Sequence, residues 1–200
     1  PTINAVLDAG GIAICMSHLG RPKGQGPEAA YSLAPVAQRL RALLGDAHPV
    51  HFVEGACRGA PAEAAVAAAV PGDVVLLDNL RFEAGEKSGD PTFAADLAAL
   101  GDAYVNDAFG TAHRSHASMV GVPRAMGGAD VKLNKGPCVA GVLLEKELRF
   151  LGQAIEHPRR PFFAVVAPHA PHLPSTPAPW YAGAFPGGKA APRTHGFGAH

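Results

Sequence analysis

The chain has 200 residues, of which 48% are hydrophobic, and it carries 17 Lys and Arg against 17 Asp and Glu. This length and composition suffice for one or two domains with a sizeable core. The zero formal charge argues against a protein that binds nucleic acid or an anionic membrane over its whole surface.

Five short apolar runs have the composition of strands that are buried on both faces of a sheet. Each run is four to six residues long. In chain order they are Gly11–Met16, Val50–Val53, Val74–Asp78, Ala103–Asn106 and Phe162–Val166.

Helical segments alternate with these runs. Apolar residues recur at helical spacing in Leu33–Leu44, Ala62–Val70 and Pro91–Leu100, and Pro1–Leu7 looks like a helix that has already begun. Asp90 is placed to cap Pro91–Leu100. Because strand and helix in alternation are typical of βαβ units, we predict an α/β fold, a Rossmann-like parallel sheet with helices on both faces.

The segment Ala140–Glu156 predicts a longer helix of about four turns. Its apolar positions are spaced by four, three and four residues, at Leu144, Leu148, Leu151 and Ile155. Such a helix could cover the sheet, or it could connect two domains.

The last part of the chain has a different composition. Residues 167–200 contain seven of the 19 prolines and four of the ten histidines, and they contain no acidic residue. Proline at this density removes amide donors and blocks helices and central strands. We therefore expect an unfolded or poorly folded tail, of the kind that a shifted reading frame after Val166 would produce.

The cysteines and the lengths of the apolar runs indicate the kind of cellular compartment that suits the protein. Cys15, Cys57 and Cys138 are too few for a disulfide framework and form no zinc-binding pair. No run approaches the roughly 18 apolar residues of a spanning helix. These features favour a soluble, cytoplasmic protein with no membrane partner.

Basic residues follow three of the predicted strands at their carboxyl ends. They are His18 and Arg21 after the first strand, Arg81 after the third, and His113, Arg114 and His116 after the fourth. In a parallel sheet these ends meet at the edge where ligands bind. Arginine suits phosphate and carboxylate oxygens, and Gly20, Gly24 and Gly110 let the backbone approach a ligand. The pattern predicts a site for a small polyanion such as a phosphate ester.

Each residue also has an ordinary interpretation. A single loop arginine is commonly solvated or ion-paired at the surface. His113 and His116 could suggest a metal, but no third ligand stands at recognisable spacing, and no metal site is predicted. Asp78 and Asp107, at strand ends, could be catalytic carboxylates, although capping or pairing with a neighbouring arginine is the commoner role.

No nucleotide-binding loop is predicted in the chain. Lys87-Ser88 lacks the upstream glycine spacing of a P-loop, and Gly187-Gly188-Lys189 also fails that template.

The three basic loops are also where the sequence resembles a known family. Met16–Pro22, Leu77–Phe82 and Asn106–His116 look like signature segments of phosphoglycerate kinases. Phe52–Glu54 and Glu145–Leu148 match further family segments in the same order, and the resemblance covers residues 1 to about 166.

This resemblance implies a two-domain glycolytic kinase that transfers a phosphoryl group between 1,3-bisphosphoglycerate and ADP, giving 3-phosphoglycerate and ATP. It divides the chain into a 3-phosphoglycerate domain (1–139), an interdomain helix (140–156), the first strand of a nucleotide domain (157–166) and the tail (167–200). Members of the family act as cytosolic monomers and use Mg-ATP or Mg-ADP. Most of the domain that binds this nucleotide is absent from the chain.

Matching motif positions assigns the substrate contacts. His18, Arg21, Arg81 and Arg114 are expected to contact 3-phosphoglycerate. Gly20, His113 and His116 would belong to the same basic patch. Phosphoryl transfer that relies on positioning and charge neutralisation fits a site with no obvious Ser or Cys nucleophile.

Three departures from the family pattern suggest a chain that is inactive alone. An opening Arg-Val-Asp-Phe-Asn-like segment, a Gly-Gly-Ala-Lys segment after Val166 and most of the nucleotide domain are missing. Two other hypotheses about its function therefore remain: a non-catalytic sugar-phosphate-binding module and a His-rich metal protein.

Overall fold

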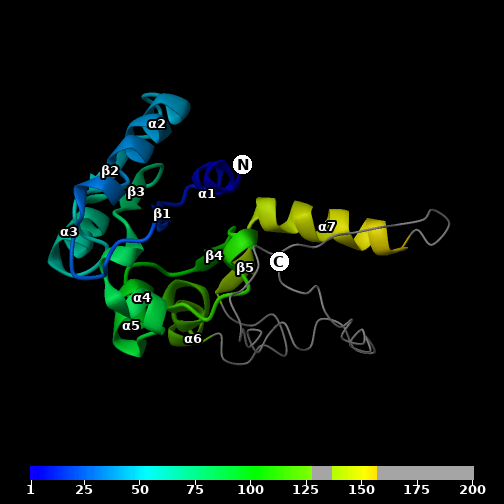
Figure 1. The fold of residues 1–200 in the computed structure, drawn as a ribbon. Coiled ribbons are helices and arrows are strands. Elements are labelled where there is room, and N and C mark those ends of the chain that lie inside the picture. Colours follow the sequence, from blue (N-terminus) through cyan, green and yellow to red (C-terminus); the bar gives the residue numbers. More distant parts are fainter. Residues whose placement is uncertain (128–136, 157–200) are drawn as a thin grey trace, which may run out of the picture.

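The computed structural model describes residues 1–127 and 137–156 (Figure 1). Its strands are β1 (Ala13–Cys15), β2 (Val50–Val53), β3 (Val74–Leu77), β4 (Tyr104–Asn106) and β5 (Cys138–Ala140). Its α-helices are α1 (Thr2–Asp8), α2 (Ala34–Leu44), α3 (Ala60–Ala68), α4 (Ala84–Ser88), α5 (Pro91–Ala98), α6 (Val122–Ala125) and α7 (Val142–Glu156). Short 3-10 turns span Ala29–Tyr31, Leu80–Phe82 and Phe109–Thr111, and a π-helical turn spans Ala117–Gly121. The predicted strand Phe162–Val166 and the tail 167–200 lie outside the described residues.

Three strands form a parallel sheet in the order β1-β3-β2. Val74 at the start of β3 lies opposite Ala13 of β1 and Val50 of β2. All four residues of β3 are buried, which explains why this run is apolar at every position. The predicted α/β fold with a parallel sheet is confirmed.

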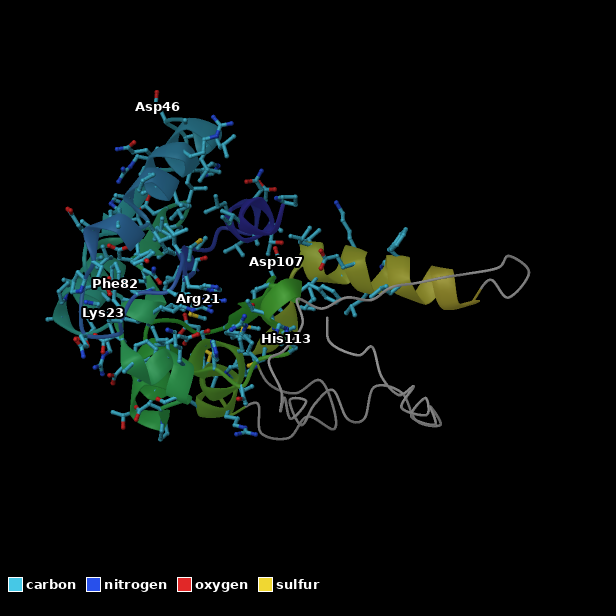
Figure 2. The ribbon with its side chains drawn as sticks, viewed as in Figure 1. Arg21, Lys23, Asp46, Phe82, Asp107 and His113 are labelled. Atoms are coloured by element: carbon cyan, nitrogen blue, oxygen red, sulfur yellow. The ribbon has the colours of Figure 1, made fainter. Side chains whose placement is uncertain are left out.

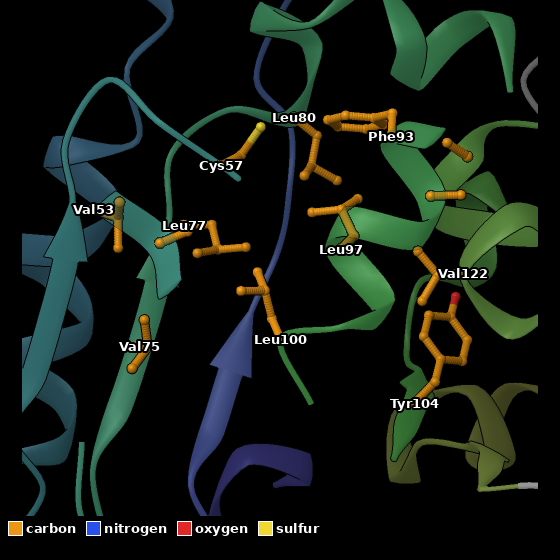
Figure 3. Packing of buried hydrophobic residues seen from close by; sticks show 13 residues of the cluster. Val53, Cys57, Val75, Leu77, Leu80, Phe93, Leu97, Leu100, Tyr104 and Val122 are labelled. Atoms are coloured by element: carbon orange, nitrogen blue, oxygen red, sulfur yellow. The ribbon is translucent and has the colours of Figure 1, made fainter. Parts of the chain in front are cut away.

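Successive β3 side chains point to opposite sides of the sheet. Because all of them are apolar, both faces need to be covered, and helices cover both. On one face, Val74 and Leu76 join a core with Leu7 of α1 and Ala37 of α2. On the other face, Val75 and Leu77 join a larger core (Figure 3). That second core takes Ala62 from α3 and Phe93, Ala94 and Leu97 from α5.

The fourth predicted strand does not join the three-stranded sheet by hydrogen bonds. Instead β4 pairs in parallel with β5, with Tyr104 opposite Cys138. The sequence analysis missed β5 and assigned Ala140 to a helix. The side chain of Tyr104 nevertheless belongs to the same core as Val75 and Leu77, so packing joins the two sheets (Figure 3).

The long helix α7 begins at Val142, two residues later than predicted, because Ala140 ends β5. The Asp107 carboxylate accepts hydrogen bonds from the amides of Leu143 (2.9 Å) and Leu144 (3.1 Å). The Thr2 hydroxyl accepts one from the amide of Val142 (3.1 Å). The first turn of α7 is thus capped by residues distant in sequence, and Figure 2 shows Asp107 beside it.

Helix α5 begins at the predicted residue, whereas α3 lies two residues before the predicted Ala62–Val70, and α4 and α6 were not predicted. The Asp90 side chain accepts a hydrogen bond from the Phe93 amide (2.7 Å) and caps α5, and Pro91 fills the first helical position. Gly45, with φ of 68°, ends α2. In the ranges that the structure describes, no helix is both long and apolar enough to cross a membrane.

Candidate functional site

The loops that follow β1 and β3 are fastened together by hydrogen bonds. The Leu80 amide donates to the Ser17 carbonyl (3.0 Å), and the Asn79 side-chain amide donates to the carbonyls of Leu19 (2.7 Å) and Tyr31 (2.9 Å). Asn79 is fully buried, and its side-chain oxygen accepts from the Arg81 amide (3.0 Å). The first two basic loops therefore form one structural unit.

Arg81 is held against the first loop by its own side chain. It is buried, with 7% of its surface exposed, and its Nη1 donates to the Gly20 carbonyl (2.7 Å). Gly20 has φ of +62°, and a Cβ there would lie 2.5 Å from the ring of Tyr31. The neighbouring ring and the positive φ together require glycine here, and the predicted approach of a ligand stays a prediction.

The other two glycines have different surroundings. Gly24 has φ of +79°, and its backbone lies against Ala84 at the start of α4. Gly110 has an ordinary φ and open space around it. The close approach of a ligand to the backbone stays a prediction at both positions.

Buried polar side chains also hold the third basic loop, which follows β4 and leads into the π-helical turn Ala117–Gly121. Glu86 of α4 accepts hydrogen bonds from the Ser118 hydroxyl (2.7 Å) and the Ser118 amide (3.0 Å). The Tyr104 hydroxyl donates to the Ser118 carbonyl (2.9 Å). His116, just before this π-helical turn, has Nδ1 3.4 Å from Glu86 Oε1.

The six predicted basic side chains of the three loops act on one another electrostatically. Burial lowers the pKa of His18, and the charges of Arg81, Arg114 and His116 lower it further. Burial and the charges of Arg114 and Arg21 likewise lower the pKa of Arg81. We call these residues, His18, Arg21, Arg81, His113, Arg114 and His116, the basic cluster.

His113 completes the cluster from the third loop. Burial lowers its pKa first, followed by the charges of Arg114 and His116. Figure 2 shows Arg21 on the loop after β1 and His113 on the loop after β4. Side chains distant in sequence thus lie within Coulombic range of each other. The parallel-sheet argument accounts for the first two loops, whereas the third loop follows β4 of the two-stranded sheet.

Two guanidinium groups of the basic cluster retain unused hydrogen-bonding capacity. Nε of Arg81 and Nε of Arg114 are buried and have no hydrogen-bond partner among the described residues. The arginine ion pairs found in this part of the chain belong to Arg58 and Arg149. An unsatisfied buried donor costs about 1–3 kcal/mol, so an anion placed between these groups would be stabilised.

The two aspartates at strand ends are structural, as the commoner interpretation held. Asp78 accepts hydrogen bonds from the amides of Leu33 (2.7 Å) and Gly55 (2.9 Å), among others, and is 1% exposed. Asp107 caps α7 and also accepts from the Thr2 hydroxyl (2.6 Å). Burial opposes ionisation of Asp107, but these hydrogen bonds outweigh it and lower its pKa. Neither aspartate pairs with a neighbouring arginine.

Sequence reasoning missed the buried polar residues that support the loops. Glu86, Ser118 and Asn79 stand in or beside the recognised segments without any periodic signal of burial. Asn79 stands two residues after the buried strand β3, and a polar residue so close to a buried strand is the signal that could have indicated its structural role. Glu86 lies in helix α4 together with Lys87 and Ser88, and nothing in its local sequence marks it as buried.

Two other features of the described residues bear on the choice of site. These residues hold no group of three or more His, Cys, Asp or Glu that could bind a metal ion. A shallow hollow of about 390 Å³ lies beside α5 and α6, lined by Ala95, Ala98, Ala99, Gly101, Asp102, Ala125, Met126 and Pro137. It shares no residue with the basic cluster and has few polar groups, so the cluster is the candidate site.

Comparison with known proteins gives a consistent result. The family model described as phosphoglycerate kinase matches residues 1–168. A phosphoglycerate kinase of Chloroflexus aurantiacus is 49% identical over 166 residues, which cover 83% of this chain and 38% of that protein. That of Chlamydia caviae is 52% identical over 169 residues, covering 83% and 39%. The chain thus spans under two fifths of the length of these curated relatives.

Solved structures agree with the sequence matches. The phosphoglycerate kinase of Coxiella burnetii superposes with a TM-score of 0.62 at 34% identity, over 80% of this chain and 36% of that chain. That of Pyrococcus horikoshii superposes with a TM-score of 0.63 at 28% identity, over 80% and 38%.

Proposed function

The chain belongs to the phosphoglycerate kinase family, and from that premise we propose that its basic cluster binds the 3-phosphoglycerate part of the substrate. In the complete protein this site would serve reversible phosphoryl transfer between 1,3-bisphosphoglycerate and ADP. We propose further that the complete protein is a cytosolic monomer that works in glycolysis. The observation that carries the assignment is the pair of buried, unpartnered Nε atoms on Arg81 and Arg114.

The cluster supplies cations for a metabolite that bears both a carboxylate and a phosphate group. The Arg81 side chain is already held by its hydrogen bond to the Gly20 carbonyl. Its guanidinium group therefore loses little conformational entropy when it binds a ligand. The pKa values of His18 and His113 are lowered, which favours the neutral rings in the free protein. A bound anion raises these pKa values, because a nearby negative charge stabilises the protonated imidazole. The site therefore neutralises and orients the substrate, which is the principal work of a protein in phosphoryl transfer.

The nucleotide needs a separate site. In the described residues no glycine-rich phosphate loop is formed, since Lys87 and Ser88 belong to helix α4. Within the described residues, Lys87 and Ser88 therefore do not form a loop that could hold the phosphates of an Mg-nucleotide. We assign the nucleotide to the part of the family protein that this chain does not match.

Calorimetric titration tests the proposal on the chain itself. The chain should bind 3-phosphoglycerate and should not bind ATP. Arg114→Ala should weaken binding of 3-phosphoglycerate by about tenfold or more, the value of one charge-assisted hydrogen bond. Arg149→Ala, which removes an exposed arginine paired only with Glu145, should bind as the unaltered chain does. Equal affinity of both variants would refute the assignment.

A binding module without catalysis would give the same titrations. Fusing residues 1–156 to the remaining part of a family member separates the two functions. Turnover of the fusion in a coupled kinase assay, lost on Arg114→Ala, supports the kinase. A folded fusion that binds both substrates without turnover supports the module.

A further inference from the structure

Glu86 is a buried acidic residue that lies next to the basic cluster. Only 2% of its surface is exposed. Its two carboxylate oxygens are engaged by Ser118, and Oε1 also lies 3.4 Å from Nδ1 of His116. The residue thus links helix α4 to the third basic loop through two neighbouring positions of that loop.

Glu86 is ionised in this environment. Burial opposes its ionisation, but hydrogen bonds from His116 and Ser118 outweigh the burial and lower its pKa. Its negative charge also acts on His18 and Arg81, where it opposes the lowering of their pKa values by the neighbouring cations. A single buried carboxylate therefore offsets part of the mutual repulsion within the basic cluster.

The contact with Glu86 favours a hydrogen on the ring nitrogen of His116 that faces it. An ionised carboxylate can only accept, so the nitrogen that faces it must be the N–H. Nδ1 of His116 faces Glu86 Oε1, and Nε2 is then left without a hydrogen in the neutral ring. That second nitrogen is the one left to accept a hydrogen bond, or to protonate and donate one to an anion.

The contact with Ser118 fixes the backbone that carries His116. The hydroxyl and amide of Ser118 donate to Glu86, while its carbonyl accepts from Tyr104. The π-helical turn Ala117–Gly121 also packs on α5, where a Cβ on Gly121 would lie 2.6 Å from Ala94. Turns of this kind are commonly found at functional sites, where they set side-chain direction.

We propose that Glu86 is a positioning residue, which holds His116 in the Nδ1–H form and anchors Ser118 so that Nε2 of His116 is available to the bound anion. The proposal rests on the assignment of the basic cluster as the 3-phosphoglycerate site. It adds that the cluster needs one buried acid as well as its cations. The charged groups around His116 are Glu86 from α4, His18 from the loop after β1, and His113 from its own loop.

The test combines ring-nitrogen NMR of His116 with titration of 3-phosphoglycerate. In the neutral ring, recorded at alkaline pH, the two 15N shifts report which nitrogen bears the hydrogen. The unaltered chain should show hydrogen on Nδ1. Glu86→Gln should move it substantially to Nε2 and weaken 3-phosphoglycerate binding about tenfold.

Glu83→Gln is the matched control, because Glu83 lies three residues away and pairs with Arg58 instead (2.9 Å). It should keep both the Nδ1–H form and the affinity. Hydrogen on Nε2 in the unaltered chain overturns the proposal even where Glu86→Gln fails to fold. So does an affinity of folded Glu86→Gln equal to or tighter than that of the unaltered chain.

The NMR result also separates this proposal from the proposed function. If the unaltered chain binds no 3-phosphoglycerate, the substrate assignment fails. The hydrogen position on His116 still reports whether Glu86 acts on that ring.

Discussion

Replacing Asn79 with alanine tests how the first two basic loops are joined. The Asn79 side chain makes three hydrogen bonds, to the Leu19 carbonyl, the Tyr31 carbonyl and the Arg81 amide. At about 1 kcal/mol net for each bond, the substitution should lower the free energy of unfolding by about 3 kcal/mol. That is a large fraction of the 5–15 kcal/mol that stabilises an ordinary domain.

Urea denaturation measures this loss directly. With a slope of about 1–3 kcal/mol per molar urea, the midpoint should fall by about 1–3 M without a change of slope. The matched control is Asn4→Ala, since Asn4 is exposed on α1. A midpoint for Asn79→Ala that matches the control would refute the reasoning that these bonds hold the loops. Weaker 3-phosphoglycerate binding should accompany the loss, because the loop bearing His18 and Arg21 is released.

Three further results are expected. Gly20→Ala should destabilise the chain by more than about 1 kcal/mol in thermal denaturation, because φ is +62° and the Tyr31 ring occupies the Cβ position, and an unchanged melting temperature would contradict this. The lowered pKa of Asp107 means that its stabilisation is present above the ordinary aspartate pKa and is lost as pH falls through the lowered value. Urea unfolding at a series of acidic pH values should show this loss in the unaltered chain and show less of it in Asp107→Asn, and identical profiles would contradict it. The lowered pKa values of His18 and His113 should rise when an anion binds, so 3-phosphoglycerate binding should take up protons near pH 7 and strengthen as pH falls from about 8 to 7. Calorimetry in buffers of different ionisation enthalpy measures this uptake, and proton release would have the wrong sign.

The elements that the sequence predicted well are those with a strong local signal. The continuous apolar run Val74–Leu77 indicated a strand buried on both faces, and β3 lies at the centre of the sheet. Asp90 marked the start of α5, where Pro91 fills the first helical position. In each case one or two neighbouring residues decide the local backbone.

The elements that were missed depend on distant partners. β5 has only three residues, of which Val139 and Ala140 are exposed, so pairing with β4 defines it rather than its own composition. The start of α7 is set by Asp107 and Thr2, which lie far away along the chain. Local patterns cannot report such contacts.

The site shows the same division. Its cations could be predicted because each arginine follows the carboxyl end of a predicted strand. Two of these strands, β1 and β3, share a sheet, whereas β4 belongs to a second sheet that packs against the first through a common core. Its supports could not, since nothing local marks Glu86 as the partner of Ser118 across 32 residues of sequence. The role of Gly20 also depends on the ring of Tyr31, which arrives from a different part of the chain.

The claim that three separate loops bind one anion is tested most directly by NMR titration of the arginine Nε–H signals. Adding 3-phosphoglycerate should shift the Nε–H resonances of Arg21, Arg81 and Arg114 together, with a single common Kd, while that of Arg149 stays in place. Resonances that follow different affinities, or that move for only one loop, would contradict a shared site.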